Sequence, residues 1–150
     1  MKRIVLIIAG ILSATAVNAA DNEKPWSVRM VESEMARNPS ATYIDGLQGK
    51  LKWNYTTGLE LSAFLDVYDR YDDRRMWDYV VEYADTIIND KGEIYGYKKE
   101  NFNIDHICPG NMLFRLYERT GEQKYRRTLR LLRGQITDQP RTSEGGFWHK

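Results

Sequence analysis

The chain has 150 residues, of which 42% are hydrophobic and 29% are charged, and this length allows one domain with a core of its own. Its 22 basic and 21 acidic residues nearly balance, so the sequence lacks the basic excess of a nucleic-acid surface. A single cysteine, Cys108, excludes an intrachain disulfide, and two histidines without an HxxxH or CxxC pair argue against a metal site.

Residues 1–20 have the pattern of a secretory signal peptide. Two basic residues precede an apolar run, and Val17 and Ala19 are the small residues that signal peptidase requires before its cut. The alternative, a membrane anchor, needs roughly 20 apolar residues, and this run is shorter. We therefore expect residues 21–150 to be exported to a periplasm or to the medium, without membrane attachment after cleavage.

The exported part is predicted to be all-α, as amphipathic helices joined by turns. Trp26 to Arg37 is the first helix, because Val28, Val31 and Met35 recur at three- and four-residue steps and share one face. Residues 38–40, which include a proline, end this helix.

The second and third predicted helices form a pair. Tyr55 to Tyr71 is the second helix, and its apolar face consists of Leu59, Phe64, Leu65 and Tyr68. Asp72 and Asp73 make a turn and begin the third helix. The expected buried stripe of this helix is Met76, Trp77, Val80, Tyr83, Ala84 and Ile87. The charged run at residues 69–75 is expected to be a solvated turn.

A second pair follows in the chain. Glu93 to Phe102 combines β-type residues with a glycine, which predicts a short hairpin or an extended loop. Pro109 suits a first helical turn, and Met112 to Arg119 is the fourth helix. Residues 120–122 turn the chain into a last helix, whose apolar face is Tyr125, Leu129, Leu132 and Ile136.

The two pairs are copies of one unit. The stretch YDRYDDRRMWDYVVEYADTII, from Tyr68, matches YERTGEQKYRRTLRLLRGQI, from Tyr117, at an offset of 49 residues. This period exceeds the ~34 residues of a tetratricopeptide unit and favours an array of α-hairpins, which needs about three units or caps. The final GGFWHK is similar to the IYGYKK loop of residues 94–99. We therefore expect residues 141–150 to open a third unit that the chain does not finish.

Connecting segments at equivalent positions carry the candidate chemistry. Asp105 and His106, in NIDHICPG, precede the fourth helix, and the 49-residue offset places Asp105 beside Tyr55 in KWNYTTG. Trp148 and His149 follow the last helix. Equivalent segments of an array lie at one end. A carboxylate, a phenol, an imidazole and aromatic faces would therefore meet there, and this set suits a sugar.

Each of these residues also has a purely structural interpretation. Asp105 could cap the helix that follows it, because an aspartate before a helix accepts backbone N–H bonds. His106 could be a surface residue. Trp53 and Tyr55 could be core packing at a helix start.

Three motifs, KWNYTTG, NIDHICPG and RTSEGGFWHK, occur in this order and together resemble glycoside hydrolase family 105. These enzymes are the unsaturated rhamnogalacturonyl hydrolases, and they are close to the unsaturated glucuronyl hydrolases of family 88. The resemblance runs from about Trp26 to the end of the chain. It implies an (α/α)6 barrel, a ring of six helical hairpins, of which residues 21–150 would form an incomplete N-terminal portion.

The resemblance also implies a reaction. The substrate is a pectin-derived oligosaccharide with a Δ4,5-unsaturated uronic acid at its non-reducing end. A general acid protonates C4, water adds at C5 and the resulting hemiketal opens, without a metal or organic cofactor. Asp105 matches one of two key aspartates and would hold the substrate and tune the partner acid. Tyr55 and His149 match positions that line the sugar subsite, and Trp148 and His106 are candidates by adjacency.

The second aspartate, the family's main acid/base, follows the FWHK motif, and no residue of this chain matches it. We therefore expect little hydrolase activity and marginal stability from these 150 residues, with an oligosaccharide ligand and no nucleic-acid or obligate protein partner. Two other interpretations stay open. One is a small non-catalytic helical-repeat module that binds carbohydrate or protein. The other is an (α/α) enzyme of another specificity, such as an epimerase or a lyase.

Overall fold

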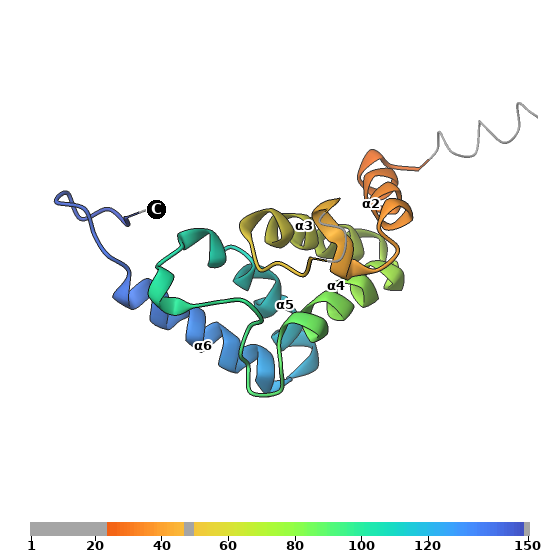
Figure 1. The fold of residues 1–150 in the computed structure, drawn as a ribbon. Helices are drawn as coiled ribbons and strands as arrows, with labels where there is room; N and C mark the ends of the chain where they lie inside the picture. Colours follow the sequence, from red (N-terminus) through yellow and green to blue (C-terminus); the bar gives the residue numbers. More distant parts are fainter. Residues whose placement is uncertain (1–23, 47–49, 149–150) are drawn as a thin grey trace, which may run out of the picture.

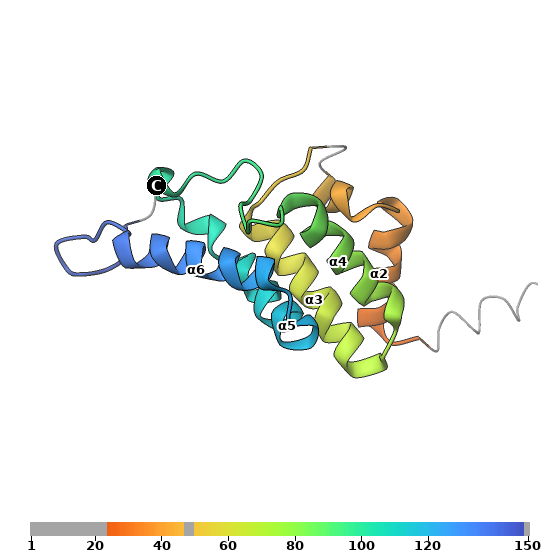
Figure 2. The same cartoon turned by 90° about the horizontal axis from the view of Figure 1, so that it is seen from below.

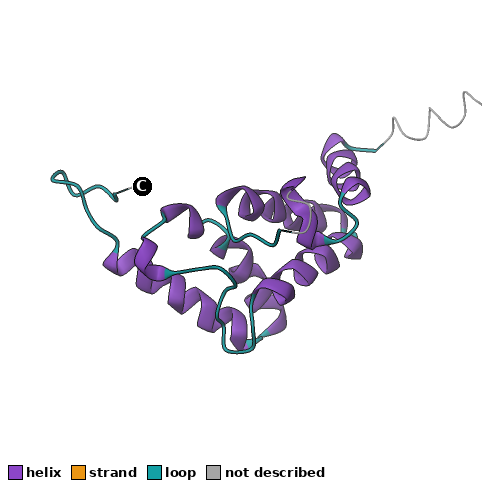
Figure 3. Ribbon diagram, in the orientation of Figure 1, coloured by secondary structure: helices purple, strands orange, loops and turns teal. Residues whose placement is uncertain are grey.

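The computed structural model describes residues 24–46 and 50–148, so the predicted signal peptide and His149 lie outside the described residues. Within these ranges the regular structure is helical, apart from two isolated antiparallel bridges (Figure 3). The five α-helices found there are α2 (Trp26–Arg37), α3 (Tyr55–Tyr71), α4 (Arg74–Ile87), α5 (Gly110–Thr120) and α6 (Gln123–Asp138). The predicted all-α class is therefore confirmed, and α2 and α3 have the predicted bounds.

The helices form two consecutive pairs, α3 with α4 and α5 with α6, as the repeat predicts (Figure 1). Helix α3 also packs against α5, which joins the pairs, and α2 packs against α3. Figure 2 shows α2 and α6 on opposite sides of the molecule, with the other three helices between them. The largest fully buried side chains of this core include Tyr83, Tyr125, Ile44, Leu61, Leu65, Met76, Ile87, Met112 and Leu113.

The predicted apolar faces hold for α2 and α4 and are partly wrong for α3. All six residues of the α4 stripe, including Trp77, are buried. In α3, however, Leu59 is 64% exposed, whereas Leu61 is fully buried. Leu61, Phe64 and Leu65 are separated by three- and four-residue steps, whereas Leu59 lies five residues before Phe64 and points to another side of the helix.

The face predicted for α6 also needs correction. Ile136 is 37% exposed, and Leu129 is only partly buried. The side chains that α6 buries are Tyr125, Thr128, Leu132 and Gln135. A glutamine therefore occupies a core position that the hydrophobic pattern could not identify, since amides are usually exposed.

Tight turns of the same geometry join the helices of each pair. Asp72 ends α3 with φ 55°, and Gly121, 49 residues later, ends α5 with φ 70°. The N–H of Asp72 donates to Tyr68 O over 2.7 Å, and the N–H of Gly121 donates to Tyr117 O over 2.8 Å. The left-handed conformation at both helix ends confirms the 49-residue repeat at the level of the backbone.

A second repeated feature follows each pair and has a different offset. Ile88 bridges Ile94 after α4, and Arg141 bridges Phe147 after α6, so this turn recurs after 53 residues. The glycines that make the two turns are Gly92, with φ 81°, and Gly145, with φ 80°.

This offset changes the alignment of the last residues. Because Phe147 takes the place of Ile94, Trp148 corresponds to Tyr95, and the predicted superposition of GGFWHK on IYGYKK is two residues out of register. The backbone hydrogen bonds support this alignment, because the N–H of Tyr95 donates to Ile87 O and the N–H of Trp148 donates to Pro140 O, each over 2.8 Å. The segment from the start of α6 to its bridge is four residues longer than the equivalent segment of α4.

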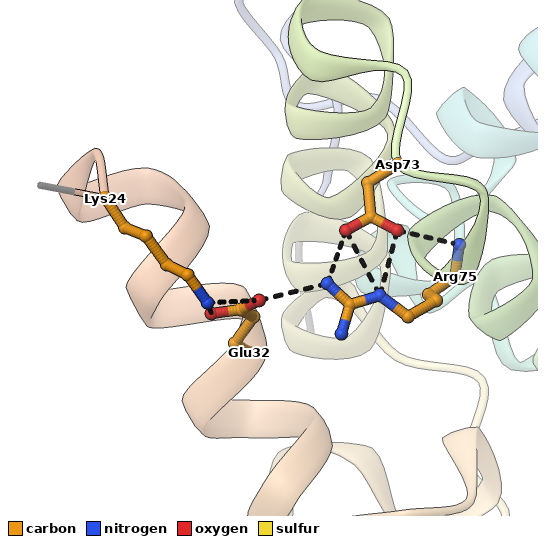
Figure 4. Close-up of polar contacts among 4 residues, drawn as sticks. All are labelled: Lys24, Glu32, Asp73 and Arg75. Carbon is orange, nitrogen blue, oxygen red and sulfur yellow. Dashed lines mark hydrogen bonds and ion pairs between the residues drawn. The ribbon is translucent and has the colours of Figure 1, made fainter. Parts of the chain in front are cut away.

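Ion pairs link α2 to the start of α4, as Figure 4 shows. Glu32 of α2 accepts from Lys24 Nζ over 2.9 Å and from Arg75 over 3.0 Å. Arg75 also pairs with Asp73 over 2.5 Å. The same charged run reaches α5 through Asp69, which pairs with Arg115 and Arg119. The run at residues 69–75 is therefore not simply a solvated turn, because its ion pairs cross between helices.

We expect Asp73→Ala to lower the free energy of unfolding by about 1 kcal/mol, because Asp73 both caps α4 and pairs with Arg75. Urea unfolding followed by circular dichroism measures this loss. The pKa of Asp73 is lowered from 3.8, chiefly by its bonds to Arg75. The stabilisation is therefore present above pH 3.8, and the loss should shrink as the pH falls below that value.

The matched control is Asp78→Ala, which removes an exposed α4 aspartate paired with Arg74 four residues earlier. A loss of no more than about 0.5 kcal/mol is expected there. Equal losses for the two variants would show that Asp73 does not act as a cap.

Candidate functional site

Three connecting segments meet around an open hollow of about 440 Å³. They are the segment before α3, the turn after α4 and the segment before α5. The lining residues are Leu51, Lys52, Trp53, Asn54, Tyr95, Gly96, Asn103, Asp105 and His106. Asp105 and His106 therefore lie beside the start of α3, as the repeat predicts for equivalent connecting segments.

Trp53 lines the hollow and is itself part of the core. Its side chain is 4% exposed, and its indole Nε1–H donates to the backbone oxygen of His106 over 2.7 Å. The next residue, Asn54, caps α3 by accepting from the N–H of Tyr55 over 2.9 Å. The core interpretation of Trp53 is therefore confirmed, and this core residue also holds the backbone of a candidate site residue.

Asp105 and His106 belong to a 3-10 turn, Ile104–His106, that precedes α5. The side chain of Asn103 caps this turn, because its Oδ1 accepts from the N–H of Asp105 over 3.0 Å. Helix α5 itself begins at Gly110 with Pro109 as its N-cap residue and no side-chain cap bond. The N-cap residue of α5 is therefore Pro109 and not Asp105.

The imidazole of His106 is half-buried among polar and aromatic neighbours. Its Nε2 lies 3.3 Å from Asn103 Nδ2, and the centre of its ring lies 5.8 Å from that of Tyr97. Burial lowers the pKa of His106 from 6.5, while the charge of Asp105 opposes this shift. Its buried Nδ1 finds no hydrogen-bond partner among the described protein atoms. The ring is therefore neutral near pH 7.

The other predicted site residues lie beside the hollow or outside the described chain. Tyr55 begins α3 and is 47% exposed, next to Asn54, but it does not line the hollow. Trp148 is 42% exposed and lies on the turn after α6, which folds back toward the segment before α5 (Figures 1 and 2). His149 lies outside the described residues, so its place in the site stays a prediction.

Sequence reasoning missed several lining residues, of which Tyr95 and Lys52 matter most. Tyr95 is 68% exposed and lines the hollow. It corresponds to Trp148 in the repeated turns, so an alignment on Gly92 and Gly145 would have found it. Lys52 adds an exposed cation that can pair with an acidic ligand. This lysine opens the KWNYTTG motif, but the motif alone gave it no role.

A larger groove of about 740 Å³ lies between α5 and α6 and contains none of the candidate residues. Its wall combines apolar side chains such as Phe114 and Ile136 with the arginines Arg126, Arg130 and Arg133. Size alone therefore does not identify the site, and the hollow near Asp105 has the better set of chemical groups.

The described residues contain no group of three or more His, Cys, Asp or Glu side chains arranged to hold a metal ion. Among the same residues, no helix combines the length and the apolar character that crossing a membrane requires.

Comparisons with known proteins agree with the resemblance of the three motifs. The sequence model of Glycosyl Hydrolase Family 88 matches residues 26–150. The solved structure of a family 105 glycoside hydrolase from C. acetobutylicum ATCC 824 superposes with a TM-score of 0.75 at 40% sequence identity. That match covers 85% of this chain and 33% of the other chain, so this chain spans a third of the length of that enzyme. The chain therefore belongs to glycosyl hydrolase family 88 and is similar to part of a family 105 enzyme.

Proposed function

We propose that this chain forms the N-terminal portion of an exported (α/α)6-barrel hydrolase and supplies one wall of its carbohydrate site. The ligand is an oligosaccharide, derived from pectin, with a Δ4,5-unsaturated uronic acid at its non-reducing end. The meeting of Asp105, His106 and Tyr95 in one hollow carries this proposal. Family membership and the similarity to a family 105 hydrolase support it.

The chemistry of the hollow suits an acidic sugar. Asp105 can accept hydrogen bonds from sugar hydroxyl groups, and the neutral ring of His106 lies beside it in the lining of the hollow. The ammonium group of Lys52 complements the uronate carboxylate. Tyr95 offers an aromatic face for the apolar side of a sugar ring. These groups bind and orient a ligand.

The proposed reaction also needs an acid that protonates C4 of the double bond, so that water can add at C5 and the hemiketal can open. Asp105 is the one carboxylate among the described residues that line the hollow. It would orient the uronic acid and tune the partner acid, which this chain does not contain at a matching position. We therefore propose binding without efficient hydrolysis for the 150 residues alone.

Calorimetric titration of the chain with an unsaturated galacturonyl–rhamnose disaccharide tests this function. We expect saturable binding of this disaccharide and weaker binding of its hydrogenated counterpart, because only the former has the flattened uronic ring. The absorbance of the double bond, followed in the same samples, should stay nearly constant. The absence of binding for both sugars would contradict the proposed function. Loss of absorbance at an ordinary enzyme rate would contradict the proposal that these 150 residues bind the sugar without efficient hydrolysis.

The second candidate function is a non-catalytic carbohydrate-binding module, and the presence of one carboxylate in the hollow favours it. Saturated and unsaturated disaccharides would then bind equally well. The same titration therefore separates the two candidates.

We expect Tyr95→Ala to raise the dissociation constant for the disaccharide about fivefold to tenfold, because a sugar face loses a stacking partner worth about 1 kcal/mol. The fold should be unaffected, since this side chain is 68% exposed. The control is Tyr71→Ala, which removes a tyrosine that is 43% exposed at the end of α3. Equal affinities of wild type and Tyr95→Ala would exclude Tyr95 from the site.

A further inference from the structure

Two buried glutamines stand out on α6 and just beyond it. Gln135 has no exposed surface, and Gln139 is 4% exposed. Burying an amide costs free energy unless its polar atoms find partners, and an apolar side chain of the same size would pack there without that cost. Helix packing alone therefore does not explain why both positions hold glutamine.

Every polar group of the two amides has a hydrogen-bond partner. Gln135 accepts from the hydroxyl of Tyr97 over 2.7 Å, and its Nε2 donates to Asn103 O over 3.0 Å and to Gln139 Oε1 over 3.1 Å. Gln139 Nε2 in turn donates to Phe102 O over 2.7 Å and to Trp148 O over 3.0 Å. The two amides form one continuous chain of hydrogen bonds, which we call the amide ladder.

The partners of the amide ladder lie in the segments that form the site. Asn103 holds the N–H of Asp105 through its side chain, and its Nδ2 lies next to the ring of His106. Tyr97 places its ring against the same imidazole. At its other end the ladder holds the backbone of Trp148. The ladder thus joins the segment that carries Asp105 and His106 to the turn that carries Trp148.

Gln139 is the point where these two segments meet. One side-chain nitrogen donates to a carbonyl on each segment, and residues 102 and 148 are 46 positions apart in the sequence. An amide of this geometry fixes the distance between the two carbonyls to within hydrogen-bond tolerance. An apolar side chain would fill the same space but would leave both segments free to shift.

We propose that Gln135 and Gln139 are positioning residues that hold the two segments in register for carbohydrate binding. This inference rests on the proposed function for its ligand, although the contacts themselves do not depend on it. Neither glutamine lines the hollow, so each acts through the residues that it holds. A displacement of about 1 Å at a site of this kind can cost far more than the hydrogen bond itself.

Four tryptophans provide a direct readout of this positioning. Trp53 reports on the segment of His106, because its indole donates to that backbone, and Trp148 reports on the turn after α6. Trp77, in the core, and Trp26, 74% exposed on α2, are internal controls. After incorporation of fluorotryptophan, fluorine NMR gives one resonance for each ring, and single Trp→Phe variants assign them.

The test uses Gln139→Met, which keeps the volume, and Gln139→Glu, which keeps the shape but removes both N–H donors. Both are expected to shift or broaden the Trp148 resonance and leave those of Trp77 and Trp26 unchanged. The dissociation constant for the unsaturated disaccharide should rise about tenfold. Gln135→Met should affect the Trp53 resonance in the same way. The control is Gln123→Met, an exposed glutamine at the start of α6.

The outcomes separate this inference from the proposed function. Unchanged Trp148 and Trp53 resonances in the folded variants would overturn the positioning role, whatever the affinity does. Shifted resonances with unchanged affinity would overturn it as well, because the ligand would then not require the register. If the wild-type chain binds no disaccharide, the proposed function fails, and the resonances alone decide whether the ladder positions the segments. Should Gln139→Met fail to fold, Gln139→Glu gives the same readout.

Discussion

Replacing Gly58 by alanine is expected to lower the free energy of unfolding by about 3 kcal/mol or more. Gly58 lies in the first turn of α3, where a Cβ atom would come within 2.5 Å of Pro109 Cα and 2.6 Å of Pro109 N. These are backbone atoms at the start of α5, so no side-chain rotation can relieve the clash. The two helices would have to move apart, and the ligand hollow beside them would change shape. Chemical denaturation measures the loss, and disaccharide titration measures the second effect.

The control is Gly134→Ala, within α6. A Cβ at this position would lie no closer than 3.7 Å to any described atom outside its own helix, and that nearest atom is the Nζ of Lys99, at the end of a long side chain. Alanine is the better helix former by up to about 1 kcal/mol, so this variant should be slightly more stable than the wild type. If Gly58→Ala does not lower the free energy of unfolding, α3 and α5 do not pack as closely as described.

Replacing Asp105 by asparagine is expected to weaken disaccharide binding by about tenfold to a hundredfold. A hydrogen bond to a charged group is worth about 1.5–3 kcal/mol, and the amide keeps the shape of the carboxylate while it removes the charge and one acceptor. Asp105 lines the hollow from the 3-10 turn before α5. Titration calorimetry of both chains with the unsaturated disaccharide gives the ratio of dissociation constants.

Asp78→Asn is the matched control for this experiment, since its carboxylate is 60% exposed on α4 and does not line the hollow. Its affinity should equal that of the wild type. Thermal unfolding of Asp105→Asn distinguishes a binding role from a purely structural one. A large fall in the melting temperature with unchanged affinity would remove Asp105 from the ligand site.

Much of the helical framework could be predicted from the sequence, because apolar residues recur at helical spacing and turn residues separate the helices. Trp26 and Tyr71 mark predicted helix ends that the structure reproduces. The buried face of a single helix was harder to predict, because the apolar residues of a short segment can be grouped into more than one stripe. Leu59 was predicted in the core on such a stripe and lies on the exposed side of α3.

The site could be predicted only in part. The 49-residue offset correctly places Asp105 and His106 beside the start of α3. The same offset could not locate Tyr95, because the turn after α6 recurs at a spacing of 53 residues. Gln135 escaped detection for another reason. A buried polar residue interrupts the hydrophobic pattern, and only the three-dimensional contacts show that its amide has partners.

The chemical nature of the amide ladder has a consequence for acid sensitivity. Glutamine side chains have no proton to gain or lose in the range where proteins stay folded, so the link between the two segments is indifferent to acidity. The half-buried ring of His106 resists protonation until the solution is more acidic than pH 6.5. Mild acidification would therefore alter the imidazole while the two amides that support its segment keep their hydrogen bonds.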